Sequence, residues 1–141
     1  MPLVEITAPA GSLSDATVGT LQREVARSVM HWMGFPDTDF FAGATWVYVT
    51  ESRKGWSATG AVDIQPGFLV VVTPLEKFLT PERNESLSIE ITRAVQEAAG
   101  LSGAEPPTVW VVVNEIPEGY WSVNGGLTRR AKIDELIARQ D

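Results

Sequence analysis

The hydrophobic positions follow two spacings along the chain, and the two spacings recur in the same order. Apolar and β-branched residues dominate residues 3–8, which predicts a β-strand. Apolar residues three or four positions apart then predict a helix that Ser12 or Ser14 caps and Gly34 ends. Residues 45–50 are again β-rich and predict a second strand. The helical stripe consists of Val18, Leu21, Val25, Val29 and Trp32.

The same order returns 66 residues later. Residues 68–73 predict a third strand, and their unbroken apolar pattern predicts burial on both faces of a sheet. Thr80 and Pro81 predict the start of a second helix, which Gly100 ends. Residues 109–114 then predict a fourth strand. A repeat of this length is one structural unit used twice.

Each strand–helix–strand unit predicts a right-handed crossover between parallel strands. Two units predict an α/β fold with a four-stranded mixed sheet and two helices on one face. The opposite face is also apolar, and the chain has no spare helix pair for it, so we expect another subunit to cover it. We expect a single domain of 1–141, divided into repeat one (about 2–51), a connection (about 52–67), repeat two (about 68–115) and a C-terminal hairpin with a helix (about 116–141).

The last segment of the chain has two predicted elements. Asn124-Gly125 is a strong tight-turn signal and predicts a short hairpin. Thr128 is then expected to cap a short amphipathic helix with Ile133 and Leu136 on its apolar side.

Composition excludes several classes of function. The chain has 11 Lys and Arg against 18 Asp and Glu, a net charge of -7, which argues against nucleic acid and anionic membranes as partners. It has no cysteine and a single histidine, so we expect no disulfides, no metal site and no cofactor. There is no long apolar run and no charged leader, so we expect no membrane span and a cytoplasmic location.

Pro2 is the strongest candidate for chemistry. Its counterpart in the second repeat is Phe68, so the strand itself does not require proline. If Met1 is removed, Pro2 carries a free secondary amine, and a free α-amine has a pKa of roughly 7.7–8 that apolar surroundings lower. Abstraction of a proton next to a carbonyl needs a base of this kind. The alternative is that Pro2 only starts the chain.

Pro2 at the head of a strand, the doubled β-α-β unit and the late Trp121-Ser122-x-x-Gly125-Gly126 hairpin resemble the tautomerase superfamily. This superfamily includes 4-oxalocrotonate tautomerase and macrophage migration inhibitory factor. The resemblance covers nearly the whole chain. It implies a homotrimer in which the N-terminal proline is the general base or acid, acting on a small enol or keto acid. The reaction would be keto–enol tautomerisation, decarboxylation, or hydration or dehalogenation, and it would depend on removal of Met1.

Within this superfamily the chain is most similar to the branches of malonate semialdehyde decarboxylase and cis-3-chloroacrylic acid dehalogenase. Gly34, Pro36 and Asp39 match the pattern Gly-x-Pro-x-x-Asp of the decarboxylase branch. The resemblance implies that Asp39 lies beside the proline and assists the chemistry. The alternative is that Asp39 caps a turn or a short helix.

The substrate-binding residues depart from the family. Members that act on carboxylates carry arginine where this chain has Leu13 and Leu79. Lys77 matches one basic position and is implied to hold a carboxylate, with a solvated loop lysine as the alternative. The resemblance also implies that Tyr120 and Trp121 wall the substrate pocket, with interface packing as the alternative.

The missing arginines, and Met1 if it is retained, favour a second hypothesis, a non-catalytic trimer that binds or signals and keeps the fold. Arg129 and Arg130 are further basic candidates, although such charges usually belong to the surface. Trp46 and Trp110 occupy related places in the two repeats, so we expect them in the core or the sheet and not at a ligand.

Overall fold

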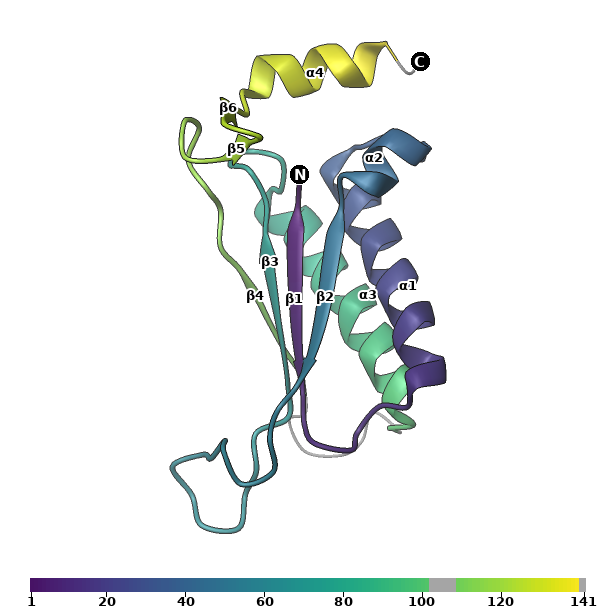
Figure 1. Ribbon diagram of the computed structural model, residues 1–141, viewed down its shortest axis with the longest axis vertical. Helices are drawn as coiled ribbons and strands as arrows, with labels where there is room; N and C mark the ends of the chain where they lie inside the picture. The colour runs from purple at the N-terminus through teal and green to yellow at the C-terminus, as the bar shows by residue number, and fades with distance from the viewer. Residues whose placement is uncertain (102–108, 140–141) are drawn as a thin grey trace.

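The computed structural model describes residues 1–101 and 109–139, and its centre is a four-stranded sheet with the order β2-β1-β3-β4 (Figure 1). β1 is parallel to β2 and antiparallel to β3, and β3 is parallel to β4. The mixed α/β sheet predicted from the sequence is therefore confirmed. The strands are β1 (Leu3–Ala8), β2 (Trp46–Glu51), β3 (Phe68–Thr73) and β4 (Val109–Val113).

Two long helices cover one face of this sheet (Figure 1). α1 (Asp15–Met33) and α3 (Pro81–Ala99) have 19 residues each, and their bounds differ by the 66 residues of the sequence repeat. Both end on a glycine with left-handed backbone, Gly34 at φ 76° and Gly100 at φ 69°, as predicted. None of the helices in the described ranges is long and apolar enough to cross a membrane.

The core lies between the helices and the sheet. Both helices bury the residues of their apolar stripes, and the strands contribute every second side chain, because successive side chains of a strand point to opposite faces. The fully buried side chains of this layer are Val4, Ile6, Leu21, Val25, Val29, Val70, Val72, Leu87, Ile91 and Val95.

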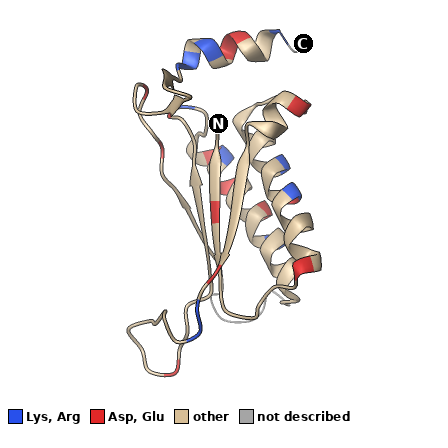
Figure 2. Ribbon diagram, in the orientation of Figure 1, with Lys and Arg blue, Asp and Glu red and all other residues tan. Residues whose placement is uncertain are grey.

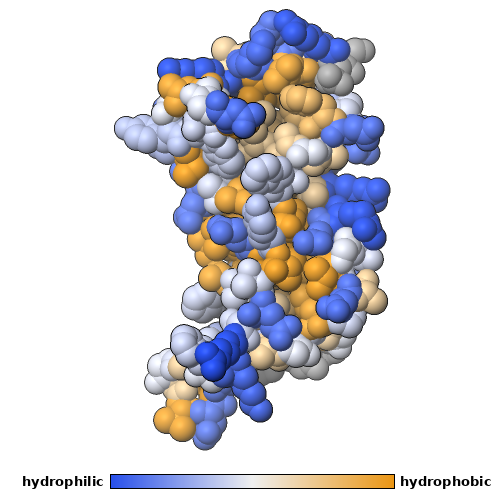
Figure 3. All heavy atoms as spheres, in the orientation of Figure 1, coloured by the Kyte–Doolittle hydropathy of each residue, from blue (hydrophilic) through white to orange (hydrophobic). Residues whose placement is uncertain are grey.

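The second face of the sheet is apolar and open in the single chain. Trp46 is 60% exposed, Trp110 is 68% exposed and Leu69 is 37% exposed, so the prediction that residues 68–73 are buried on both faces is wrong for the monomer. The reason is that both helices pack on the same side, as each right-handed crossover requires. Figure 2 shows few charged residues on the strands, and Figure 3 shows hydrophobic atoms exposed along the middle of the molecule, where the strands lie.

The remaining short elements gather at the end of the sheet where β1 begins. A hairpin of β5 and β6, predicted from Asn124-Gly125, is followed by a helix that lies across this end of the sheet (Figure 1). The helix begins at Arg130, so Thr128 is not its cap, and the Thr128 hydroxyl instead donates to Met1 Sδ at 3.7 Å. The short helix α2 was not predicted as an element. These elements are α2 (Asp39–Gly43), β5 (Ser122–Val123), β6 (Gly126–Leu127) and α4 (Arg130–Ala138).

The two long helices begin differently although they are repeats of one unit. Thr80 Oγ1 accepts a hydrogen bond from the Arg83 N–H at 3.2 Å, which satisfies a free donor of the first turn of α3. Ser14 holds the same position before α1, but its side chain makes no cap hydrogen bond. The Ser12 hydroxyl donates to the Pro9 carbonyl, so neither serine caps α1 as expected.

We therefore expect the two capping positions to respond differently to alanine. Thr80→Ala should lower the free energy of unfolding by about 1 kcal/mol, because it leaves the Arg83 N–H without its partner. Ser14→Ala is the matched control and should change it by no more than a few tenths of that amount. Urea unfolding followed by circular dichroism measures both variants. Equal losses would show that the two caps contribute alike.

Candidate active site

The strand order places the amino terminus at one end of the sheet, beside the inner strand β1. Pro2 directly precedes β1, and its carbonyl accepts a hydrogen bond from the Trp46 N–H at 3.2 Å. Because β1 lies between β2 and β3, Pro2 has a strand on either side and is buried. The antiparallel pairing of β1 with β3 brings the segments that follow β3 and β4 to this same end.

A cleft of about 960 Å³ opens around this terminus. Its walls come from Met1 and Pro2, from α2 and the start of β2, and from the hairpin and α4. This volume lies within the range of small-molecule sites, which are mostly apolar with a few polar groups. The large apolar side chains that line it are Phe40, Trp46, Trp121, Leu127, Ile133 and Leu136.

The α-amino group of Met1 lies in this cleft. It donates a hydrogen bond to the Ala44 carbonyl, and burial lowers its pKa from the ordinary 8.0 to about 5. Among residues 1–101 and 109–139, no aspartate or glutamate lines the cleft to stabilise a positive charge. An amine in these surroundings is therefore neutral at pH 7 and has a free lone pair, which is the form that accepts a proton.

The structure brings together only part of the predicted site. Pro2 and Trp121 both line the cleft. Asp39 is exposed as the first residue of α2, whose cap is Thr38, and it is not among the lining residues of the single chain. Lys77 and Tyr120 are also exposed outside the cleft, Tyr120 to 81%. The roles of all five residues stay predictions.

Several lining residues were not predicted. Trp46 was expected in the core or the sheet, yet it lies on the open face and lines the cleft, as does Phe40 of α2. Lys132 was not predicted, and Arg129 was predicted only as a further basic candidate, of a kind that usually belongs to the surface. The sequence contained a pattern that could have identified these two cations. Arg129, Lys132 and Leu136 recur at helical spacing and therefore share one side of the last segment.

Potential metal ligands are not clustered in the cleft. Within residues 1–101 and 109–139, no three His, Cys, Asp or Glu side chains are placed to hold a metal ion together.

Solved structures with the same architecture belong to the tautomerase superfamily. A wild-type fused 4-OT that forms a symmetric trimer shares 21% identity and a TM-score of 0.72, over 89% of this chain and 94% of that chain. Pt0534, inactivated by 2-oxo-3-pentynoate, shares 22% identity and a TM-score of 0.73, over 92% and 98% of the two chains. Malonate semialdehyde decarboxylase, which has decarboxylase and hydratase activities, shares 20% identity and a TM-score of 0.64, over 94% and 96%.

These likenesses establish the class of fold. This chain has the tautomerase-superfamily fold, as its repeat and its hairpin predicted. No protein-family model matches the sequence, and no curated protein matches it in sequence. Identities near 20% show a shared architecture and do not show a shared reaction.

The buried amine has a measurable consequence. In protein that retains Met1, titration of the Met1 amine, followed by ¹⁵N NMR, should give a pKa near 5 and not the ordinary 8.0. Because the unfolded chain binds the extra proton between these two values, the free energy of unfolding should fall by up to a few kcal/mol as the pH drops from 8 to 5. A terminal pKa close to 8 would mean that water reaches the amine freely.

Proposed function

We propose that the chain is an enzyme of the tautomerase superfamily in which Pro2, once Met1 is removed, is the general base and acid for a small enol or keto acid. The observation that carries the proposal is the buried amino terminus, which lies in an apolar cleft that no carboxylate of the described residues lines. Pro2 is itself buried. Its own amine would therefore also lose contact with water, which is the cause of the lowered pKa of the Met1 amine.

The proposed reaction needs a single group that takes up and returns a proton. The lone pair of the Pro2 nitrogen removes the proton from the carbon next to the substrate carbonyl, and the electrons of that C–H bond form the enolate. The Pro2 ammonium then returns the proton to another atom of the substrate, so the amine ends in its starting form. A lowered pKa serves both steps. It keeps the Pro2 amine neutral and able to accept a proton at pH 7, and it makes the protonated amine a better proton donor.

The other predicted site residues enter the proposal with roles taken from the family resemblance. Asp39 orients or activates the substrate, and Lys77 pairs with its carboxylate. Lys77 follows β3 and therefore lies at the same end of the sheet as Pro2. Tyr120 and Trp121 wall the pocket, Trp121 within its own chain and the exposed Tyr120 toward a neighbouring subunit.

We further propose that the protein is a homotrimer. The fused 4-OT neighbour forms a trimer, and the open sheet face of this chain supports the same assembly. That face exposes Trp46, Tyr48, Trp110 and Val112, an apolar surface that a soluble protein normally covers. Three chains that pack these faces around one axis would cover all of them.

A non-catalytic trimer is the second candidate, and one observation favours it. Leu13 and Leu79 stand where carboxylate-binding members carry arginine. A protein of this kind would keep the assembly and the cleft but would not turn over enol or keto acids. The two candidates differ in turnover and in the state of the amino terminus.

Turnover should depend on a free Pro2 amine. Protein whose Met1 has been removed should interconvert the keto and enol forms of phenylpyruvate, which ultraviolet absorbance follows. Protein that retains Met1, produced with methionine aminopeptidase inhibited, should show kcat/KM at least 100-fold lower, because its Pro2 nitrogen is an amide without a lone pair for the proton. Pro2→Ala should abolish turnover.

Intact mass identifies which terminus each preparation carries. Equal rates with and without Met1 would remove Pro2 from the mechanism. A processed protein that shows no turnover would favour the non-catalytic trimer.

Assembly should depend on the open sheet face and not on apolar exposure in general. Trp110→Glu should convert a trimer, with three times the 15.3-kDa mass of one chain, into monomers in light scattering, because it puts a charge on an apolar interface. Ile89→Glu is the control, since Ile89 is 55% exposed on α3, away from the open face. Dissociation by both variants, or by neither, would contradict the proposed interface.

A further inference from the structure

We propose that Arg129 and Lys132, beside and within α4, bind the carboxylate of the ligand, and that this ligand carries a bulky apolar group. The proposal rests on the function proposed above, because it assigns the substrate contacts of the same cleft. It answers the question that Leu13 and Leu79 raise, namely which cations replace the family's arginines. It assigns the carboxylate to these two residues in place of Lys77, which is exposed and does not line the cleft.

The charges that line the cleft have one sign. Arg129 and Lys132 are its only charged side chains in the described residues, and both are positive. The chain as a whole carries a net charge of -7, so a wall with two cations and no anion departs from the average of the surface. Figure 2 shows Lys and Arg residues in blue at the start of α4, above the N-terminus. A wall of this kind attracts an anion from solution.

Both cations form only exposed ion pairs in the single chain. Arg129 Nη1 lies 3.8 Å from Glu118 Oε1, beyond hydrogen-bond distance, and both side chains are exposed. Lys132 Nζ lies 2.9 Å from Glu135 Oε2, but the other oxygen of Glu135 is bound by Arg139 at 2.6 Å. Lys132 can therefore turn to a ligand while Glu135 keeps a partner. Exposed ion pairs contribute at most about 1 kcal/mol, so this exchange meets little resistance.

The neighbouring Arg130 is held in a different way. Its Nη1 donates to the Lys77 carbonyl at 2.6 Å, its guanidinium lies 4.2 Å from the centre of the Phe78 ring, and it pairs with Asp134. It does not line the cleft. Arg130 thus fastens α4 to the loop after β3, which leaves Arg129 and Lys132 as the cations available to a ligand.

The apolar walls define the other half of the ligand. Phe40, Trp46 and Trp121 supply aromatic surface, and Leu127, Ile133 and Leu136 supply aliphatic surface. A short dicarboxylic acid would leave this surface in contact with water or with a second charge. A monocarboxylic acid with an aryl or branched alkyl group would bury it, at roughly 25 cal/mol for each Å² removed from water.

Binding of an unreactive acid tests the assignment without requiring turnover. Quenching of tryptophan fluorescence, which Trp46 and Trp121 should report, measures the affinity for 3-phenylpropanoate and for its neutral amide. The wild type should prefer the acid. Lys132→Gln and Arg129→Gln should each weaken acid binding roughly 5- to 10-fold and leave amide binding unchanged, because each removes one charge-assisted hydrogen bond. The double variant should lose the preference for the acid.

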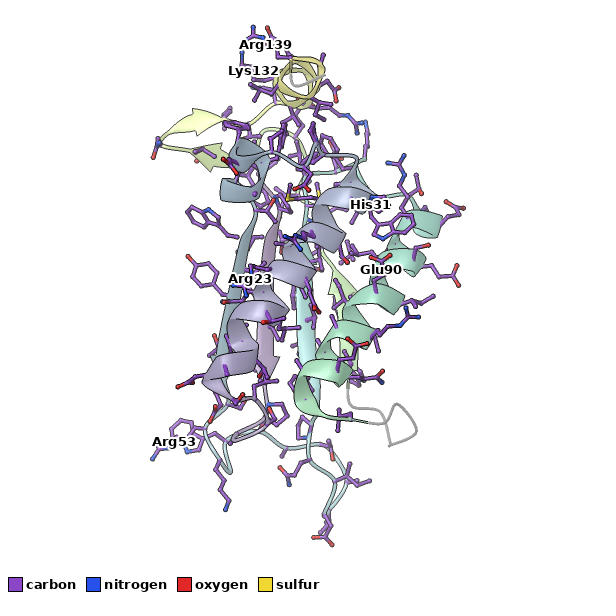
Figure 4. All side chains as sticks on the ribbon, turned by 90° about the vertical axis from the view of Figure 1, so that its right-hand side faces the viewer. Arg23, His31, Arg53, Glu90, Lys132 and Arg139 are labelled. Atoms are coloured by element: carbon purple, nitrogen blue, oxygen red, sulfur yellow. The ribbon has the colours of Figure 1, made fainter. Side chains whose placement is uncertain are left out.

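Arg139→Gln is the matched control for Lys132→Gln. Arg139 directly follows α4 and pairs with the same Glu135, but it does not line the cleft. Figure 4 labels Arg139 and Lys132 close together near α4. Arg139→Gln should keep the wild-type preference for the acid, and circular dichroism should show that all variants are folded. Equal effects at residues 132 and 139 would mean that net charge, and not a contact, attracts the acid.

The remaining outcomes separate this assignment from the proposed reaction. If the wild type shows no preference for the acid, or the double variant keeps it, or Lys77→Gln alone removes it, the assignment to Arg129 and Lys132 is wrong. That result leaves a Pro2-dependent turnover of keto acids intact. If the predicted pattern of binding appears but no enol or keto acid is turned over, the reaction is wrong and the anion site stands.

Discussion

Burial of the amino terminus is the constraint on which the rest of this structure depends. The chain begins in an inner strand, so its first residues have strands on both sides and the hairpin with α4 at the end. A positive charge in that position would lose its water without gaining an anion, and the amine is therefore held neutral at pH 7. The proposed chemistry assumes that the same burial keeps the Pro2 amine neutral once Met1 is removed.

The open sheet face and the cleft share a boundary at Trp46. This side chain is exposed on the open face, where its ring lies 6.4 Å from that of Tyr48, and it also lines the cleft. A molecule that covers the face near Trp46 therefore also changes the surroundings of the cleft. In the proposed trimer, assembly and substrate binding would be linked through this residue.

The repeat explains the scaffold, and the departures from the repeat explain the site. α1 and α3 match residue for residue in length and position, and both end at a left-handed glycine. The first repeat carries the amino terminus, and the short helix α2 lies within it, between α1 and β2. The segment after β4 has no counterpart at all, and it supplies both cations of the cleft. The repeated units form the sheet and the two long helices, while the cleft is lined mainly by segments outside the repeated pattern.

Sequence alone determined the two long helices, the four strands, their order along the chain and the mixed sheet. The reason is that the hydrophobic spacings and the glycine stops act over a few neighbouring residues. It also singled out Pro2 and Trp121. Only the tertiary structure decided that Trp46 and Phe40 face the cleft, that Asp39 and Lys77 lie outside it in one chain, and that α4 brings its cations over the amino terminus. The approach of α4 to the amino terminus joins segments more than 100 residues apart, and no local pattern encodes the direction in which a helix folds back.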